Sequence, residues 1–348
     1  MVKIITFGCR INCYESQVIK EKLANLTNVG IVNTCCVTKE AERQSCQAIR
    51  KIHKENPDYT IVACGCAVQH NPEKFAKMKE VDLVLGNLEK LQTDVFLQKN
   101  KDNNEKVFVG DIGKNNKCPE HIITGFDGKQ KAFVQIQQGC NHFCSYCIVP
   151  FVRGRAFSLP EKKIVEQVQK LLDSRFDEIC LTGIDICSYA PSFCDLVECL
   201  LENLEIPVLN FGSLDPAKID DKFINLLKKY KNIAPFLHFS IQSGDNDILK
   251  LMRRRHTREQ VIDVCQKIKN VRPDLVLGAD FICGFPTETL EQFENTLKLV
   301  DEAGLTNLHV FPYSQRSGTL ANNMPQLPME ERRRRAKILR QKGEMING

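Results

Sequence analysis

Residues 135–155 read QIQQGCNHFCSYCIVPFVRGR and carry a CxxxCxxC pattern made by Cys140, Cys144 and Cys147. The apolar alternation just before it, AFVQI at 132–136, predicts a strand. The cysteines should therefore lie on a loop after the carboxyl end of a strand, where α/β proteins place their chemistry. Thiolates are soft ligands that prefer zinc, Cu(I) or iron–sulfur clusters. With no obvious fourth ligand nearby, the pattern indicates a cluster with one open iron; three unrelated cysteines are the alternative.

The bulk composition is that of an ordinary globular protein. The chain has 348 residues, of which 43% are apolar and 26% charged, and this length predicts two domains. Its apolar runs are only strand-length, and its start, MVKIITF, lacks the cleavage region of a signal peptide. We therefore expect a cytoplasmic protein without a membrane partner. In that reducing compartment, 17 cysteines favour metal or catalytic roles over disulfides, although most must be inert packing residues.

The excess of positive charge is concentrated near the carboxyl end. The net charge is +5, and the segment from Glu330 to Lys342, with seven basic and two acidic residues, accounts for all of it. A local basic patch is a better cue for nucleic acid than net charge, and a solvated helix face is the alternative. The candidate RNA-binding residues are Arg332, Arg333, Arg334, Arg335, Lys337 and Arg340.

The first 110 residues alternate strand-like and helix-like segments. Helical patterns lie near 15–26, 39–54 and 72–79. Such alternation predicts an α/β fold with a doubly wound, mostly parallel sheet. Strands are predicted at 3–7, 30–33, 60–63, 83–85 and 107–109.

Three of these strands lead into cysteines, namely Cys9, Cys35 and Cys66. The carboxyl ends of parallel strands share one edge of a sheet, so residues that are distant in sequence can meet there. This arrangement predicts a second metal site. The residues alone leave its members open, because further candidates are close in sequence: Cys13, Cys36, Cys46 and Cys64.

A polar, Asn-rich linker at 99–127, which includes Cys118, precedes a second alternating region. Six strand-and-helix units there predict an open, partial (βα)6 barrel rather than the full eight. Its strands are predicted at 132–137, 178–182, 208–213, 237–242, 276–283 and 307–312, and its helices at 160–175, 193–203, 220–231, 258–271 and 289–303. We expect domains at 1–110 and 129–325, joined by a linker at 111–128, and a basic helix at 326–348.

Polar residues follow two of the predicted barrel strands. The run LTGID at 181–185 has a glycine that permits close approach of backbone, and a carboxylate two residues later. The run FSIQSG at 239–244 ends another strand with polar side chains that suit ribose hydroxyls. Both ends should face the same rim as the cysteine loop.

Other residues near these motifs have two possible roles. Arg153, Arg155 and the arginines of 253–255 could contact cofactor or substrate through two-pronged hydrogen bonds, or could only form salt bridges. His238 and His309 lie singly in strands, so a structural role is expected, because only a positioned histidine does acid–base work. Neither histidine has the spacing of a zinc site.

Taken together, these motifs resemble the radical S-adenosylmethionine methylthiotransferases. The resemblance rests on the cysteine triplet with its following IVP and RGR, on the GC, NTC and GC motifs of the first domain, and on HVFPYSQRSGTLA at 309–321. It implies that Cys140, Cys144 and Cys147 hold a 4Fe–4S cluster whose fourth iron binds S-adenosylmethionine. It also implies an auxiliary 4Fe–4S cluster on Cys9, Cys35 and Cys66. The cofactor contacts that it implies are Thr182, Gly183, Asp185, Ser240, Gln242, Ser243, Pro312 and Tyr313.

The final motif is similar to the branch of this family that modifies threonylcarbamoyladenosine. The resemblance implies transfer of a methylthio group to carbon 2 of that nucleoside at position 37 of tRNA. One S-adenosylmethionine methylates sulfur at the auxiliary cluster, and a second yields a 5′-deoxyadenosyl radical that removes hydrogen from carbon 2. The implied partners are tRNA and a low-potential electron donor of flavodoxin or ferredoxin type, and the sulfur donor stays open.

Rival functions share part of this chemistry. The substrate could instead be isopentenyladenosine in tRNA or an aspartate of a ribosomal protein. A non-catalytic iron–sulfur electron carrier and a zinc-binding RNA module are rivals of other classes. The family usually continues with a small β-barrel, the TRAM domain, and we expect a chain ending at Gly348 to lack it. The basic helix would then be the main carboxyl-terminal candidate for binding RNA.

Overall fold

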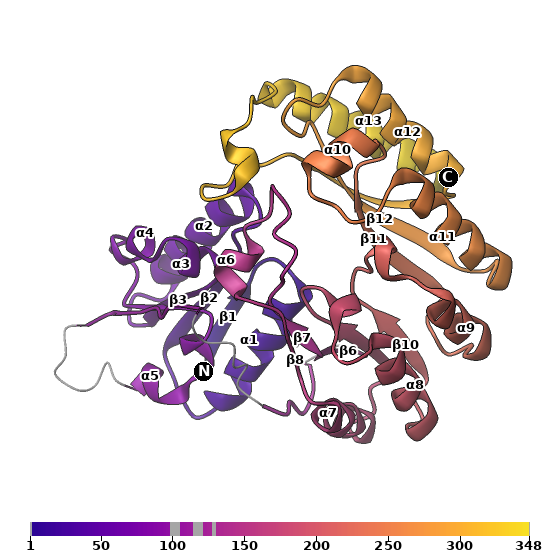
Figure 1. Cartoon of the computed structure of the whole chain (residues 1–348). Helices are drawn as coiled ribbons and strands as arrows, with labels where there is room; N and C mark the ends of the chain where they lie inside the picture. The colour runs from indigo at the N-terminus through magenta and orange to yellow at the C-terminus, as the bar shows by residue number, and fades with distance from the viewer. Residues whose placement is uncertain (1, 98–104, 114–120, 127–129, 348) are drawn as a thin grey trace. The chain divides into compact units, whose positions relative to one another are not determined.

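The computed structural model describes residues 2–97, 105–113, 121–126 and 130–347. The predicted linker lies partly outside these residues, as does Cys118, and the predicted domain limits stay predictions. The chain divides into two compact units, both drawn in Figure 1. The amino-terminal unit comprises Met1–Asn141, Ile148–Phe176 and Thr182–Ile184; the carboxyl-terminal unit comprises His142–Cys147, Asp177–Leu181 and Asp185–Gly348.

A five-stranded parallel sheet is central to the amino-terminal unit. Its strands follow chain order: β1 (Val2–Thr6), β2 (Val29–Thr34), β3 (Thr60–Gly65), β4 (Leu83–Leu85) and β5 (Val107–Phe108). Strand β2 is buried along its whole length, and β3 from its second residue, as expected for parallel strands covered on both faces. The parallel α/β sheet predicted from the sequence is confirmed.

Helices connect these strands: α1 (Arg10–Lys22), α2 (Lys39–Glu55), α3 (Cys66–His70), α4 (Pro72–Ala76), the 3-10 turn η1 (Glu89–Leu91) and α5 (Thr93–Leu97). Helix α2 begins where the Thr38 side chain accepts a hydrogen bond from the Ala41 N–H, an N-cap of ordinary kind. Helix α1 begins five residues before its predicted start at residue 15. Its first turns bury the polar residues Asn12 and Glu15, which hide the apolar period on which the prediction depended.

The segment around the cysteine motif belongs largely to this unit. It contains β6 (Lys131–Gln135), β7 (Gln137–Gln138), α6 (Val149–Arg153), β8 (Phe157–Ser158) and α7 (Glu161–Asp173), and β7 pairs with β8 in the antiparallel sense. Strand β6 packs against α1, and α6 packs against α3. Because α3 follows β3 directly, the residues just after the cysteine motif lie beside the carboxyl end of a strand of the sheet.

The carboxyl-terminal unit contains most of the predicted barrel strands. These are β9 (Glu178–Thr182), β10 (Val208–Phe211), β11 (Phe236–Gln242), β12 (Val276–Cys283) and β13 (Asn307–Pro312). Strand β9 pairs parallel with β10, and β11, β12 and β13 form a parallel sheet in that order. With β6 they are the six strands predicted for the (βα)6 region, and β9, β12 and β13 match their predicted bounds.

The helices of this unit are η3 (Ile186–Ser188), α8 (Phe193–Asn203), η4 (Pro216–Lys218), α9 (Asp221–Lys229), α10 (Asn246–Leu251), α11 (Arg258–Val271), α12 (Leu290–Glu302), η5 (Leu320–Asn323) and α13 (Met329–Asn347). Two of them begin with reciprocal capping boxes, Thr257 with Gln260 in α11 and Thr289 with Gln292 in α12. Among the described residues, no helix is both long and apolar enough to cross a membrane.

Candidate active site

The cysteine loop is held by backbone contacts at both ends. Gly139 has a positive φ of 69°, and a Cβ there would lie 1.9 Å from the Arg155 carbonyl oxygen, so only glycine fits. The next residue, Cys140, donates its N–H to the Gly154 oxygen at 3.1 Å. In the carboxyl-terminal unit, Ser145 donates its N–H to Met252 O and its hydroxyl to Leu251 O. The thiols of Cys140, Cys144 and Cys147 are all partly exposed.

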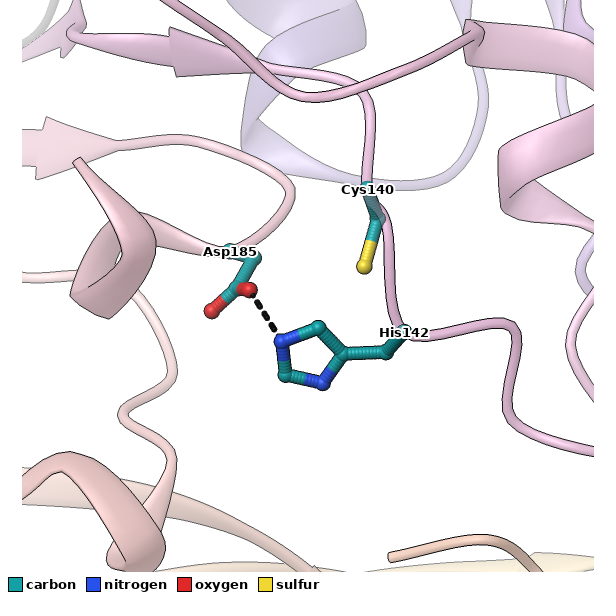
Figure 2. Close-up of side chains that lie close together, drawn as sticks. All are labelled: Cys140, His142 and Asp185. Atoms are coloured by element: carbon teal, nitrogen blue, oxygen red, sulfur yellow. Dashed lines mark ion pairs between the residues drawn. The ribbon is translucent and has the colours of Figure 1, made fainter. Parts of the chain in front are cut away.

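A histidine that the sequence analysis did not single out lies in this loop, two residues after Cys140. The Nε2 of His142 is 2.7 Å from a carboxylate oxygen of Asp185, as Figure 2 shows. Burial lowers the pKa of His142, but hydrogen bonds with Asp185 and Cys144 outweigh burial and raise the pKa to about 9. The imidazole is therefore positively charged at neutral pH.

The thiol of Cys144 lies in positive surroundings. Arg254 places a guanidinium nitrogen 3.6 Å from the Cys144 sulfur and donates to the Ser240 carbonyl oxygen at 2.6 Å. Burial raises the pKa of this thiol, but the hydrogen bond from His142 and the charge of Arg254 together bring it below its ordinary value. Partly exposed thiols, one of them favoured as thiolate, fit the soft ligand set that an iron–sulfur cluster requires.

Two arginines of 253–255 lie at this site. Arg254 contacts Cys144, and Arg255 lies 3.9 Å from Asp185 and 3.2 Å from Asp215. Asp215 also lies 3.5 Å from His256, and neither residue was among the predicted site residues. The run of charges after strand β11 could have pointed to His256. Asp215, however, follows strand β10, so no local pattern links the two residues.

The predicted cofactor contacts are only partly brought together. Asp185 meets His142, and the Ser240 backbone meets Arg254. Gln242 ends β11 with a positive φ of 81°, just after a bulge. The remaining contacts are spread along strand ends: Thr182 is the buried last residue of β9, Gly183 follows it, Ser243 is buried next to Thr296, Pro312 ends β13, and Tyr313 is buried with Phe285, Ile248 and Met252.

The second set of cysteines lies where three adjacent parallel strands end. Cys35 follows β2 directly, Cys66 begins α3 right after β3, and Cys9 is the N-cap of α1 after β1. Gly8 makes the approach possible, because a Cβ at this residue would lie 2.7 Å from the Cys35 sulfur. Burial, and after it the neighbouring thiols of Cys66 and Cys9, raise the pKa of Cys35 to about 12.

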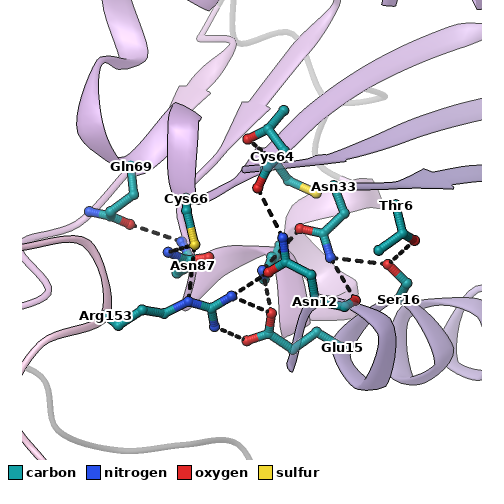
Figure 3. A network of polar contacts seen from close by, with 12 residues as sticks. Thr6, Asn12, Glu15, Ser16, Asn33, Cys64, Cys66, Gln69, Asn87 and Arg153 are labelled. Atoms are coloured by element: carbon teal, nitrogen blue, oxygen red, sulfur yellow. Dashed lines mark hydrogen bonds and ion pairs between the residues drawn. The ribbon is translucent and has the colours of Figure 1, made fainter. Parts of the chain in front are cut away.

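Cys66 is the member of this set whose thiol pKa is lowered. A hydrogen bond from Cys36 brings its pKa well below the ordinary value, against the effect of burial, and the charges of Arg153 and Lys90 lower it further. Figure 3 shows Arg153 reaching this sulfur, with Glu15 on the far side of the guanidinium. Cys36 itself is fully buried. Three cysteines at one sheet edge, one of them with a lowered pKa, also fit an iron–sulfur cluster.

The two histidines that were expected to stand alone are brought together by strand register. His238 on β11 and His309 on β13 lie 3.0 Å and 3.4 Å from the same oxygen of Asp280 on β12. Gly278 opposite His238 leaves room for the ring, since a Cβ there would lie 2.7 Å from Nδ1. The expectation that these histidines are isolated is wrong, because contacts across three strands have no signature in local spacing.

Two of the six predicted RNA-binding residues serve the fold instead. Arg332 is 3% exposed and donates to the Tyr313 and Leu327 carbonyl oxygens. Arg335 is 5% exposed and pairs with Glu288 at 2.8 Å. These two predictions are corrected, because buried guanidinium groups cannot reach a phosphate. The other four residues on α13 are exposed: Arg333, Arg334, Lys337 and Arg340.

Comparison with known proteins identifies the family. The chain matches the Radical SAM superfamily over residues 134–300 and the Uncharacterized protein family UPF0004 over residues 1–86. It is 47% identical, over 350 residues, to the threonylcarbamoyladenosine tRNA methylthiotransferase MtaB of Rickettsia prowazekii (strain Madrid E), covering 98% of this chain and 82% of that protein. The chain belongs to the radical S-adenosylmethionine methylthiotransferase family.

Two further relatives and one solved structure extend the comparison. The protein of the same description from Aquifex aeolicus (strain VF5) is 35% identical, covering 97% of this chain and 86% of the relative. A tRNA-2-methylthio-N(6)-dimethylallyladenosine synthase of Staphylococcus epidermidis (strain ATCC 35984) is 33% identical, covering 97% and 70%. The fold is similar to that of the radical S-adenosylmethionine methyltransferase TsrM from Kitasatospora setae, with a TM-score of 0.68 at 13% identity, covering 92% and 76%.

Family membership carries a cofactor requirement. Radical S-adenosylmethionine enzymes use a 4Fe–4S cluster together with S-adenosylmethionine, and the cysteine loop of this methylthiotransferase offers a ligand set that fits. The predicted fold class and enzyme class are both confirmed.

Proposed function

We propose that this methylthiotransferase adds a methylthio group to carbon 2 of threonylcarbamoyladenosine at position 37 of tRNA. The observation that carries the proposal is the 47% identity, over nearly the whole chain, to a protein described by that substrate. Three further relatives with 32–35% identity share the same description. The two separate cysteine sets are what a reaction needs when it both forms a radical and delivers sulfur.

The first cysteine set would generate the radical. Cys140, Cys144 and Cys147 would hold a 4Fe–4S cluster, which with bound S-adenosylmethionine supplies the 5′-deoxyadenosyl radical that removes hydrogen from carbon 2. Arg254 contacts the Cys144 sulfur and also donates to the Ser240 carbonyl oxygen, so it links the cysteine loop to the end of β11. Strand-end residues would contact the cofactor: Thr182, Gly183, Asp185, Ser240, Gln242, Ser243, Pro312 and Tyr313.

The second cysteine set would hold the sulfur that is transferred. Cys9, Cys35 and Cys66 would ligate an auxiliary 4Fe–4S cluster, the second of the two in the chain. The glycines before Cys9 and Cys66 have positive φ angles of 91° and 97°, so the backbone turns sharply just before each ligand. Cys36 is assigned the role of a hydrogen-bond donor to Cys66 rather than that of a ligand.

The partners follow from the chemistry. Exposed Arg333, Arg334, Lys337 and Arg340 on α13 would contact phosphates of the tRNA. A low-potential electron donor of flavodoxin or ferredoxin type would reduce the first cluster, and the sulfur donor is open. A cytoplasmic location fits a tRNA substrate.

A second candidate substrate is the dimethylallyl form of adenosine, favoured by the 33% identical relative from Staphylococcus epidermidis. One experiment separates the two. The chain is expressed in a bacterial strain that lacks its own tRNA methylthiotransferases, and tRNA nucleosides are profiled by mass spectrometry. Methylthio-threonylcarbamoyladenosine supports the proposal, whereas methylthio-dimethylallyladenosine alone supports the second candidate. If the chain carries its iron and yet forms neither product, both candidate substrates are overturned.

A further inference from the structure

The last residue of α6, Arg153, reaches across to a cysteine 87 positions earlier in the chain. Its Nε donates a hydrogen bond to the Cys66 sulfur at 3.1 Å. Only 3% of Arg153 is exposed. The side-chain amide nitrogen of Asn87 lies 3.7 Å from the same sulfur. It also donates a hydrogen bond to the Val152 carbonyl oxygen at 2.7 Å. Two N–H groups anchored at α6 therefore point at one sulfur.

The remaining guanidinium nitrogens of Arg153 are all occupied by partners from helix α1 and its surroundings (Figure 3). One contacts the Asn12 side-chain oxygen and lies 2.9 Å from a Glu15 oxygen. The other contacts the second Glu15 oxygen, and lies 3.4 Å from the Gln138 side-chain oxygen. A guanidinium held in this way on two sides has its Nε direction determined by the fold, not by the sulfur.

The charges of this buried group do not balance without the sulfur. Glu15 contributes one negative charge, and it pairs with two cations, Arg153 and Lys90, the latter at 2.6 Å. The side chains of all three are at most 1% exposed. A buried net positive charge is costly unless a partner compensates it. The Cys66 sulfur lies 3.1 Å from Nε of this guanidinium, and it supplies a second negative charge when it binds iron as a thiolate.

We propose that Arg153 is a positioning residue of the auxiliary site, and that its hydrogen bond to Cys66 sets the reduction potential of the iron–sulfur cluster held there. This inference rests on the proposed auxiliary cluster. Hydrogen bonds to cluster sulfurs and nearby positive charge make reduction easier, because they stabilise the extra negative charge of the reduced state. Helix α6, which starts two residues after Cys147, thereby adjusts the reduction potential of the cluster that the other cysteine set would hold.

The test uses the full chain in the background Cys140→Ala, Cys144→Ala and Cys147→Ala, so that only auxiliary iron remains. Each variant is reconstituted anaerobically, its iron is counted, and its midpoint potential is measured by a redox titration followed by electron paramagnetic resonance. Arg153→Gln removes the charge and its hydrogen bond. We expect at least about a tenfold loss in the reduction equilibrium constant, a shift of about 59 mV to more negative potential.

Arg153→Lys keeps the charge and the pairing with Glu15 but lacks the Nε donor, so we expect full folding and a smaller shift in the same direction. This variant decides the matter if Arg153→Gln fails to fold. The matched control is Arg43→Gln, which removes an exposed arginine of the same unit that pairs with Glu40, and it should leave the potential unchanged. A merely structural role for Arg153 would lower stability without moving the potential.

The outcomes separate this inference from the proposed function. Full iron with an unchanged potential in both Arg153 variants would overturn the role of Arg153 alone. A background chain that takes up no iron would overturn the auxiliary site and the inference with it.

Discussion

The two cysteine sets are surrounded by different kinds of charge. Around Cys66, the charged groups are Arg153, Lys90 and Glu15, and all of them are buried. None of these residue types has an ordinary pKa near neutrality. The electrostatics of this set should therefore depend on packing and stay constant over the physiological pH range.

In the carboxyl-terminal unit, three carboxylates instead pair with imidazoles. Asp185 faces His142, Asp215 faces His256, and Asp280 faces two histidines. Histidine is the side chain whose charge changes most readily near neutral pH. Cys66 thus lies beside permanently charged groups, whereas Cys144 lies beside Arg254 and also beside His142, whose charge depends on pH.

The largest expected effects come from removing one ligand from each set. Cys144→Ala should abolish reductive cleavage of S-adenosylmethionine, and with it methylthiolation, because the first cluster loses a ligand. Production of 5′-deoxyadenosine, measured by liquid chromatography with a chemical reductant, checks the first effect. Cleavage of S-adenosylmethionine at the wild-type rate would show that Cys144 is not a ligand of the first cluster.

Cys35→Ala should abolish the function of one cysteine set and leave that of the other intact. We expect methylthiolated nucleoside to disappear while 5′-deoxyadenosine is still formed, since the first cysteine set is untouched. Cys36→Ala is the matched control, because it removes the adjacent buried thiol and should abolish neither activity. If Cys36→Ala also removed the auxiliary iron, the assignment of the three ligands would be wrong.

Glu15→Gln tests the permanent charges around Cys66. Two buried cations would lose their carboxylate, which should destabilise the iron-free chain by about 3–5 kcal/mol in urea unfolding. The exposed pair of Lys3 and Glu55 in the same unit offers the control, and Glu55→Gln should cause no measurable change. Equal effects of the two substitutions would show that burial of the network contributes nothing.

Asp280→Asn tests the imidazole-paired carboxylates. Burial raises the pKa of Asp280, but hydrogen bonds with His238 and His309 bring it down to about 2. A depressed folded-state pKa stabilises the fold above the unfolded-state pKa near 4, and that stability is lost as pH falls toward 2. The iron-free variant should therefore be less stable by about 2 kcal/mol at pH 7, with the gap narrowing below about pH 5.

The control for this prediction is Asp274→Asn. Asp274 also has a pKa lowered to about 2, by a hydrogen bond with Arg272, but its side chain is 56% exposed. Solvent screens such a pair, so its removal should matter less. A gap for Asp280→Asn that does not change with pH would contradict the role of the two histidines.

The smallest effects are expected on helix α13. Lys337→Gln and Arg333→Gln each remove one exposed charge, and each should weaken tRNA binding slightly and lower the salt dependence of affinity by about one unit of slope. Filter binding over a range of salt concentrations measures both. Lys162→Gln, an exposed lysine of the amino-terminal unit, is the control. If the salt dependence of tRNA affinity is unchanged in both α13 variants, this helix does not contact the RNA.

Much of the fold could be predicted because long elements repeat a pattern. Strands β9, β12 and β13 match their predicted bounds, since each is a short, largely apolar run between helical segments. The five-residue helices α3 and α6 were not predicted, because a helix this short does not repeat its apolar positions. Those two helices carry Cys66 and Arg153, so the part that local pattern missed is central to the proposed auxiliary site.

One of the two cysteine sets could be proposed from the order of amino acids alone, because Cys140, Cys144 and Cys147 are close in sequence. The choice of Cys9, Cys35 and Cys66 among neighbouring cysteines also needed the resemblance of their GC and NTC motifs to a known family. The surroundings of those thiols, in contrast, depend on the folded chain. Arg153 meets Cys66, and His238 meets His309, through contacts between residues far apart in sequence. Such contacts depend on strand register and helix packing, which leave no trace in local periodicity.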